Sequence, residues 1–182
     1  MRHKRNPDPV SDPNIKNLEG VVDRRILDAM RAASAQLTKL GIRHALVGGL
    51  AIGAYGHVRA TKDVDFLVGD EGFDHYSGGL ISTVKGFPSR VTDIQVDALS
   101  AMPEEKHLER AVGRAVISDG IPVAPIEILV YLKLKSPRPK DALDILELLM
   151  IGIESAPILA YLRENAPGLV EKFKQLVQRS RS

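Results

Sequence analysis

The spacing of apolar residues changes twice along the chain. From residue 18 to residue 40, apolar side chains recur every three or four positions and the pattern stops at Gly41, which predicts an amphipathic helix. From residue 45 to residue 117 the apolar runs are short and are separated by glycine-containing loops, which is typical of strands mixed with short helices. After Pro125 the helical spacing returns and continues to the end of the chain.

Within these stretches the pattern predicts individual elements. The expected strands cover residues 45–47, 64–68, 80–84, 94–99 and 115–117. Short helices are expected over residues 50–55 and from Pro103, and C-terminal helical segments over residues 126–132, 142–149, 158–162 and 169–177. Residues 69–92 contain five glycines, and their pattern decides least clearly between helix and strand.

The order of these elements predicts an α+β fold, in which a sheet packs against a C-terminal group of helices. We divide the chain into three parts. Residues 1–17 hold three prolines among polar residues and are expected to form a flexible, extended tail. Residues 18–122 form the sheet-containing core, and residues 123–182 form a C-terminal helical segment packed on it.

Composition excludes several classes of protein. The 182 residues include 25 Lys and Arg against 23 Asp and Glu, which is too balanced for a chain coated by nucleic acid. Cysteine is absent, so disulfides, thiolate catalysis and cysteine-based zinc sites are excluded. No apolar run approaches the roughly 20 residues of a membrane-spanning helix, and the basic start has no apolar segment behind it. We therefore expect a cytoplasmic protein with no membrane contact.

Asp63-Val64-Asp65 is the first candidate for chemistry. Residues two apart on a strand share a face, so Val64 can enter the core while both carboxylates project to the opposite side. Two carboxylates this close repel each other unless a positive charge lies between them. A hard divalent cation such as Mg²⁺ (or Mn²⁺) would supply that charge. The alternative is two surface aspartates at a strand edge.

Gly48-Gly49 follows a predicted strand and precedes a short helix. Two glycines let the backbone approach a ligand closely, and unpaired N–H groups at the start of a helix favour phosphate. The lysine and hydroxyl of a P-loop do not follow, and the third glycine of a dinucleotide-binding motif is missing. The alternative is an ordinary turn between strand and helix.

Asp97 is a third candidate acid, on the strand predicted over residues 94–99. If that strand lies beside the strand of Asp63 and Asp65, three carboxylates converge. Such a cluster can hold two cations about 4 Å apart, one activating an attacking oxygen and one stabilising the leaving oxygen. Asp93 competes for this assignment, but its position at the start of the strand favours a turn.

Two motifs together resemble the nucleotidyltransferase superfamily of the DNA polymerase β type. The first is GG-x-A-x-x-x-x-G-x-x-R-x-T-x-D-V-D, matched by Gly48, Gly49, Ala51, Gly56, Arg59, Thr61, Asp63 and Asp65. The second is the helical segment K…R-x-K-D-x-x-D-I, matched by Lys133, Arg138, Lys140, Asp141, Asp144 and Ile145. The pattern is closest to the branch that contains AbiEii-type toxins and related bacterial and archaeal nucleotidyltransferases. The match covers about residues 44–150.

This resemblance implies a short mixed sheet flanked by helices. It also implies that Asp63, Asp65 and Asp97 are the catalytic, metal-binding residues, and that the nucleotide-binding residues are Gly48, Gly49, Arg59, Thr61, Lys62 and Lys133. Asp141 and Asp144 lie three apart on a helix, and we expect them to pair with Lys140 or Arg138 or to cap that helix. The chain departs from the family after Asp65, where the usual next helix cannot be placed.

The implied activity is transfer of a nucleoside monophosphate from an NTP to a hydroxyl, with release of pyrophosphate. The acceptor could be tRNA, a protein or a small molecule, and the chain could be a toxin–antitoxin component with a cognate antitoxin. Two alternatives stay open. One is a module of the same fold that binds nucleotide or a partner without turnover, and the other is a DxD glycosyltransferase that uses a nucleotide sugar.

Overall fold

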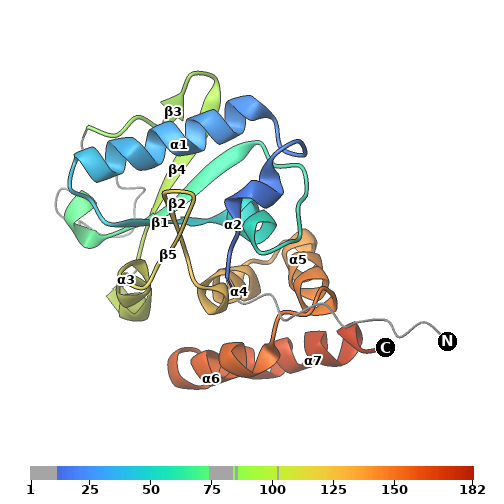
Figure 1. Ribbon diagram of the computed structural model, residues 1–182. Coiled ribbons are helices and arrows are strands. Elements are labelled where there is room, and N and C mark those ends of the chain that lie inside the picture. Colours follow the sequence, from blue (N-terminus) through green and yellow to red (C-terminus); the bar gives the residue numbers. More distant parts are fainter. Residues whose placement is uncertain (1–11, 74–83, 85, 102) are drawn as a thin grey trace.

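The computed structural model describes residues 12–73, 84, 86–101 and 103–182 (Figure 1). The strands are β1 (His44–Val47), β2 (Asp63–Val68), β3 (Arg90–Val91), β4 (Ile94–Ser100), β5 (Val116–Ser118) and β6 (Ile121–Val123). The α-helices are α1 (Arg24–Lys39), α2 (Gly48–Ala54), α3 (Lys106–Val112), α4 (Ile126–Lys135), α5 (Pro139–Met150), α6 (Ser155–Asn165) and α7 (Val170–Ser180). Short 3₁₀ helices cover Ile15–Leu18, Asp70–Gly72, Pro103–Glu105 and Pro167–Leu169.

The six strands form one mixed sheet in the order β3-β4-β2-β1-β6-β5. β1 is antiparallel to β2 and parallel to β6, and β2 is parallel to β4. The outer pairs β3/β4 and β5/β6 are antiparallel. The predicted α+β class, with a mixed sheet flanked by helices, is therefore confirmed.

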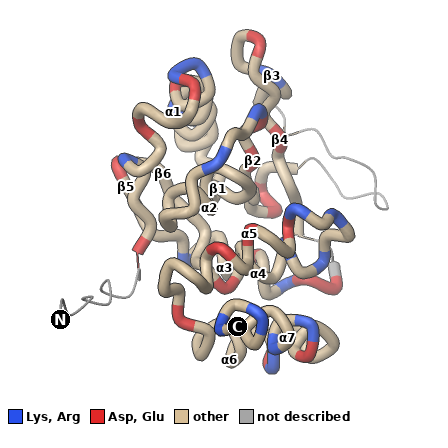
Figure 2. Tube along the Cα trace, turned by 90° about the vertical axis from the view of Figure 1, so that its right-hand side faces the viewer, with Lys and Arg blue, Asp and Glu red and all other residues tan. Residues whose placement is uncertain are grey.

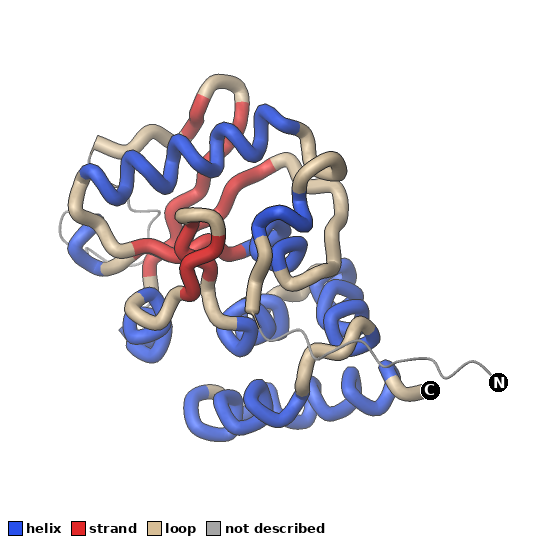
Figure 3. Tube along the Cα trace, in the orientation of Figure 1, coloured by secondary structure: helices blue, strands red, loops and turns tan. Residues whose placement is uncertain are grey.

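Helices cover the two faces of the sheet differently. α1 lies across one face, and α4 to α7 lie on the other side, with α6 and α7 farthest from the strands (Figures 1 and 3). His44 of β1 faces α1, because its Nε2 lies 2.8 Å from the Ser34 hydroxyl and its ring packs against Phe66 of β2. By alternation, Val64, Phe66 and Val68 face α1, and Asp63, Asp65 and Leu67 face the other way.

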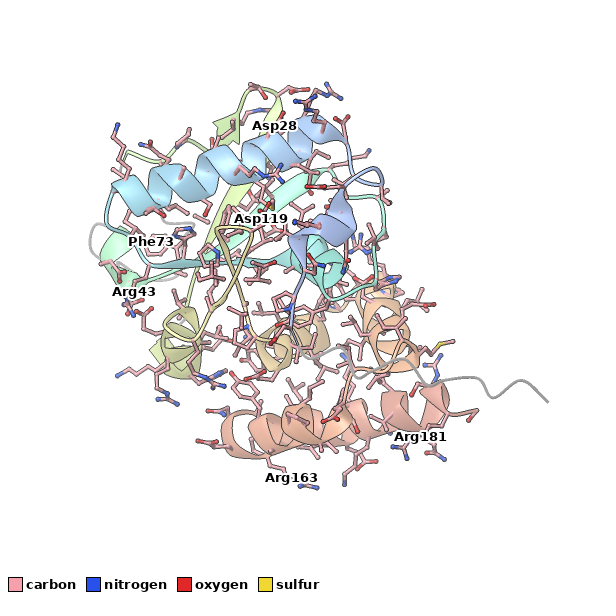
Figure 4. The ribbon with its side chains drawn as sticks, viewed as in Figure 1. Asp28, Arg43, Phe73, Asp119, Arg163 and Arg181 are labelled. Carbon is pink, nitrogen blue, oxygen red and sulfur yellow. The ribbon has the colours of Figure 1, made fainter. Side chains whose placement is uncertain are left out.

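The apolar core fills the space between these layers. Buried side chains come from α1, from the four inner strands β4, β2, β1 and β6, and from the inner faces of α2, α4 and α5. Charged side chains such as Asp28 on α1, Arg163 on α6 and Arg181 after α7 point outward (Figure 4). This distribution is what the helical and strand periodicities of the sequence predict.

The first helix begins later than its apolar pattern indicates. Asp23 is the N-cap, and its carboxylate accepts a hydrogen bond from the backbone N–H of Arg25 at 2.9 Å. Gly20, with φ of 76°, turns the chain before this cap. The predicted end is confirmed, since Gly41 has φ of 71° directly after the helix.

The predicted flexible tail over residues 1–17 is wrong at its C-terminal end. Residues 1–11 lie outside the described part of the chain. Ile15–Leu18 is a 3₁₀ helix, and Ile15 and Leu18 are buried against α2. The Asn14 N–H donates to the Ala54 carbonyl at 2.8 Å, and the Ile15 N–H donates to the Ser118 hydroxyl at 3.0 Å. Two buried apolar side chains at a spacing of three and these two hydrogen bonds together hold this segment to the core.

The boundary between the sheet-containing core and the helical segment lies later in the chain than predicted. β6 pairs with β1 in the sheet, so the helical segment starts at Ile126 and not at residue 123. β3 and β6 are two and three residues long, too short for alternation to predict. Of the strand predicted over residues 80–84, only Val84 is described, and it forms an isolated bridge with Phe73.

Candidate functional site

Parallel pairing of β2 with β4 places two acids side by side. Asp65 lies opposite Asp97, and Asp63 lies opposite Gln95, all on the face away from α1. Asp65 and Asp97 are half-buried, and Asp63 is exposed. The Gln95 amide donates to both carboxylate oxygens of Asp97, at 2.9 and 3.1 Å. The condition that the strand over residues 94–99 lies beside the strand of Asp63 and Asp65 is met.

Asp93 does not join these acids. It follows Thr92, whose φ is 55°, in the turn between β3 and β4. Its carboxylate lies 3.1 Å from the Arg25 guanidinium. The interpretation of Asp93 as a turn residue is confirmed.

The carboxyl of Asp65 resists ionisation. Burial, followed by the neighbouring charges of Asp97 and Asp63, raises the pKa of Asp65 to about 6, and Lys133 and Arg138 oppose this rise only in part. At neutral pH the group is charged at a cost. A cation placed between Asp65 and Asp97 would remove that cost, so the electrostatics of the pair favour a bound metal ion.

Gly48 brings the backbone directly against Asp65. Its φ is 68°, a left-handed conformation that favours glycine, and a Cβ there would lie 2.0 Å from Oδ2 of Asp65. The pairing of Val47 with Asp65 across β1 and β2 fixes this approach. The carboxylate therefore rests on the turn between β1 and α2, and any side chain at position 48 would displace it.

Replacing Gly48 with alanine is expected to lower the free energy of unfolding by roughly 2–4 kcal/mol, from left-handed strain and the clash with Asp65. Gly49→Ala is the matched control. The nearest atom to its Cβ would be the Thr61 hydroxyl at 3.1 Å, and its φ lies outside the left-handed region. Urea unfolding of both variants measures the difference. Equal losses would show that Gly48 is not held against Asp65.

The loop between α2 and β2 covers Gly49. Thr61 Oγ1 lies 3.1 Å and Arg59 Nη2 lies 3.7 Å from the position of a Cβ on that glycine. The Thr61 hydroxyl donates to the Asp63 carbonyl at 3.3 Å. Two residues predicted to bind nucleotide, Arg59 and Thr61, thus lie at the Gly48-Gly49 turn, whereas Lys62 is exposed beside them.

Lys133 reaches the same region from α4 and is buried between two carboxylates. Its Nζ lies 2.6 Å from Oδ1 of Asp141 and 2.6 Å from Oδ2 of Asp144. Arg138 pairs with Asp141 at 2.7 Å, which confirms one of the expected pairings. Arg59 donates two hydrogen bonds to the Asp144 carboxylate, from Nε at 2.7 Å and from Nη2 at 2.9 Å. Sequence reasoning missed that Asp141 and Asp144 bind Lys133 and Arg59 themselves.

A pocket of about 330 Å³ joins these groups. Its charged lining is Asp65, Lys133, Arg138 and Asp141, and its backbone edge is Val47 and Gly48. The remaining wall is aliphatic, formed by Ile52, Leu99, Leu129 and Leu132. Figure 2 shows acidic positions along β2 and β4 and both basic and acidic positions on the facing helices α4 and α5. The pocket offers an acid, fixed cations and an apolar surface within one small volume.

The donor set at the sheet fits a hard cation bound with its substrate. Within the described part of the chain, no three His, Cys, Asp or Glu side chains are gathered closely enough to hold a metal ion by themselves. Mg²⁺ needs fewer protein ligands than this, because it keeps several waters and is usually bound by one or two carboxylates together with substrate phosphates. Asp65 and Asp97 supply two such carboxylates on adjacent strands.

The aliphatic wall was not found from the sequence. Ile52, Leu129 and Leu132 belong to helical patterns that predict only core, and Leu99, which is 42% exposed, ends a strand pattern. The available signal was Leu99 itself, a large apolar residue two positions after Asp97 and hence on the same face.

Comparison with protein-family models and with curated proteins gave no match for this chain. Among the described residues, no helix is both long and apolar enough to cross a membrane.

Proposed function

We propose that this chain is a metal-dependent nucleotidyltransferase of the DNA polymerase β type, which transfers a nucleoside monophosphate from an NTP to a hydroxyl. The observation that carries the proposal is the register of β2 and β4, which sets Asp65 beside Asp97 while the Gly48 backbone lies against Asp65. Carboxylates for a cation and a side-chain-free backbone for phosphate thus lie at one point.

Each group at the site has a place in this reaction. Asp65 and Asp97, with Asp63 at the rim, would hold Mg²⁺ or Mn²⁺, which when bound would neutralise phosphate charge and lower the pKa of the acceptor hydroxyl. Lys133 and Arg138 line the pocket and would bind phosphate oxygens. The aliphatic wall would receive the nucleoside.

The proposed chemical step exchanges one bond at the α-phosphorus for another. The acceptor oxygen bonds to the α-phosphorus, the bond from that phosphorus to the oxygen bridging to the β-phosphate breaks, and pyrophosphate leaves. The hydroxyl proton passes to a carboxylate, and we assign this role to Asp97, which lies beside Asp65 on the face of the sheet away from α1.

In the presence of Mg²⁺, a saturating NTP is expected to raise the melting temperature, because a ligand that binds only the folded state stabilises it. At a hundredfold excess over Kd the gain is about 2.7 kcal/mol, or roughly 5–10 °C for a chain of this size. Differential scanning fluorimetry with and without EDTA measures it. A shift of the same size in EDTA would contradict a metal site at Asp65 and Asp97.

Transfer itself is tested by incubating the protein with labelled NTPs, Mg²⁺ and cell extract. Label on tRNA, protein or a small molecule supports the proposal and identifies the acceptor. Nucleotide binding without label transfer would favour the non-catalytic module. Sugar transfer from a nucleotide sugar would favour the glycosyltransferase.

A further inference from the structure

The carboxylate of Asp144 lies where three segments of the chain meet. Its side chain is 3% exposed and accepts two hydrogen bonds from Arg59, in the loop before β2. It also pairs with Lys133 of α4 at 2.6 Å, and His57 Nε2 lies 3.4 Å away. One buried group on α5 therefore fixes cationic side chains from two other segments.

These contacts form an alternating row of charges, which we call the charge row: Arg138, Asp141, Lys133, Asp144 and Arg59. Three members are cations and two are carboxylates, so the row has an excess of positive charge. It runs from the start of α5, past the pocket, to the loop over Gly49.

The two carboxylates of the charge row fix the orientation of the Lys133 ammonium group. An ammonium group has three N–H donors, and Asp141 and Asp144 accept two of them. Lys133 lines the pocket together with Asp65, so a ligand bound there would meet the third donor of this ammonium group. Without Asp144 the ammonium would keep one carboxylate partner and could rotate about its flexible stem.

Arg59 is fixed in the same way. A planar guanidinium that makes two parallel hydrogen bonds to one carboxylate is held in position and in orientation. Its Nη2 lies 3.7 Å from the position of a Cβ on Gly49. The hydrogen bonds to Asp144 therefore also fix how closely the loop between α2 and β2 approaches the Gly48-Gly49 turn.

Stability alone is a weak reason for such an arrangement. Well-packed apolar side chains of similar volume often replace a buried ion pair without loss of stability. Three members of the charge row, Lys133, Arg138 and Asp141, line the pocket, and the Lys133 ammonium there is already buried and oriented by its two carboxylates. Groups oriented in advance bind an anion without the cost of ordering them.

We propose that Asp144 is a positioning residue of the nucleotide site, which holds Lys133 and Arg59 in the orientation that receives the triphosphate. This rests on the proposed function, since it assumes that the pocket takes an NTP. Asp144 does not itself touch nucleotide, and its effect passes through the two cations.

The test compares Asp144→Asn with wild type, using titration with MgATP and with magnesium tripolyphosphate, and steady-state transfer. We expect affinity for both ligands to fall roughly ten- to a hundredfold, the range for losing an oriented charged hydrogen bond, while kcat at saturation changes much less. Asp144→Glu keeps the carboxylate and should recover part of the affinity. Glu147→Gln, an exposed position on the same helix, is the matched control and should bind as wild type does.

Arg59→Lys covers the case in which Asp144→Asn does not fold. Arg59→Lys keeps the charge but cannot make two parallel hydrogen bonds, and it should also raise KM more than it lowers kcat. Where Asp144→Asn folds, the double variant Asp144→Asn/Lys133→Gln adds a further check. Its loss of affinity should be smaller than the sum of the two single losses, because part of the effect of Asp144 passes through Lys133.

The outcomes separate the two proposals. A wild-type protein that binds neither MgATP nor tripolyphosphate overturns the proposed function. A wild-type protein that binds both, with unchanged affinity in a folded Asp144→Asn or in Arg59→Lys, overturns the positioning role alone. Losses that add fully in the double variant also overturn it.

Discussion

Asp65→Asn is expected to make the metal-free protein more stable at pH 8 and to abolish transfer. Burial and the charges of Asp97 and Asp63 raise the pKa of Asp65 to about 6, so ionising it in the folded protein costs free energy. Asparagine removes that charge with little change of volume. The gain is on the order of 1–3 kcal/mol, because each unit of pKa corresponds to about 1.4 kcal/mol.

The same prediction has a pH signature. Because the folded state binds this proton more tightly than the unfolded state does, the favourable contribution of Asp65 is complete below about pH 4 and is lost as pH rises through about 6. The advantage of Asp65→Asn should therefore be absent at pH 4 and reach its full size above pH 7. Urea midpoints in EDTA at several pH values measure it.

Asp63→Asn is the control, since Asp63 is exposed on the same strand and raises the pKa of Asp65 less than burial and Asp97 do. Its removal should therefore change the midpoint less than Asp65→Asn does. A destabilised Asp65→Asn that still transfers nucleotide would identify Asp65 as a structural acid, and the proposed function would lose its main support.

Lys133→Met is expected to lower the free energy of unfolding by about 3 kcal/mol. Removing one member of a buried ion pair costs several kcal/mol, because the partner charge stays buried. Here Asp141 and Asp144 both lose an ammonium at 2.6 Å, although Arg138 and Arg59 still face them. Methionine keeps the apolar stem, so the loss reports charge and not packing.

This variant should also weaken the protein in acid. Burial opposes ionisation of Asp141, but hydrogen bonds from Lys133, Ser136 and Arg138 hold its pKa at about 2. A lowered pKa adds stability above about pH 4 that is lost as pH falls towards 2. Without Lys133 that loss should begin at higher pH, which urea unfolding between pH 3 and 7 would reveal.

Lys140→Met, at an exposed position on α5, is the control and should unfold as wild type does. If both lysine variants had the same midpoint, the pairing of Lys133 with its two carboxylates would contribute nothing measurable.

The parts of the fold that follow from periodicity were predictable. Seven apolar positions at helical spacing predict α1, and alternation over residues 94–99 predicts β4. That alternation also puts Asp97 on the face of the strand opposite Val96. To predict that Asp97 lies near Asp65, one must also know that the two strands are adjacent. The sequence does not predict this adjacency, and the sheet order shows that β2 and β4 are neighbours.

The environment of Lys133 could not be predicted in the same way. Its neighbours Leu132 and Leu134 are equally compatible with a lysine that extends to solvent and with one aimed into a site. The partners Asp141 and Asp144 lie on the next helix, so their approach depends on the geometry of the turn around Pro137 and Pro139. The angle between α4 and α5 cannot be predicted from the sequence of such a turn.

The candidate site is assembled from three distant stretches of chain, and this affects when a newly made protein can hold it. Gly48 and Asp65 come early, Asp97 follows, and Lys133 with its partners comes late. During synthesis from the N-terminus, β2 and β4 can pair only after the segment between them has emerged, and the charge row closes only after α5. A ribosome-bound chain therefore carries Asp63, Asp65 and Asp97 before it carries Lys133 and Arg138, and the candidate site is complete only after α5 has emerged.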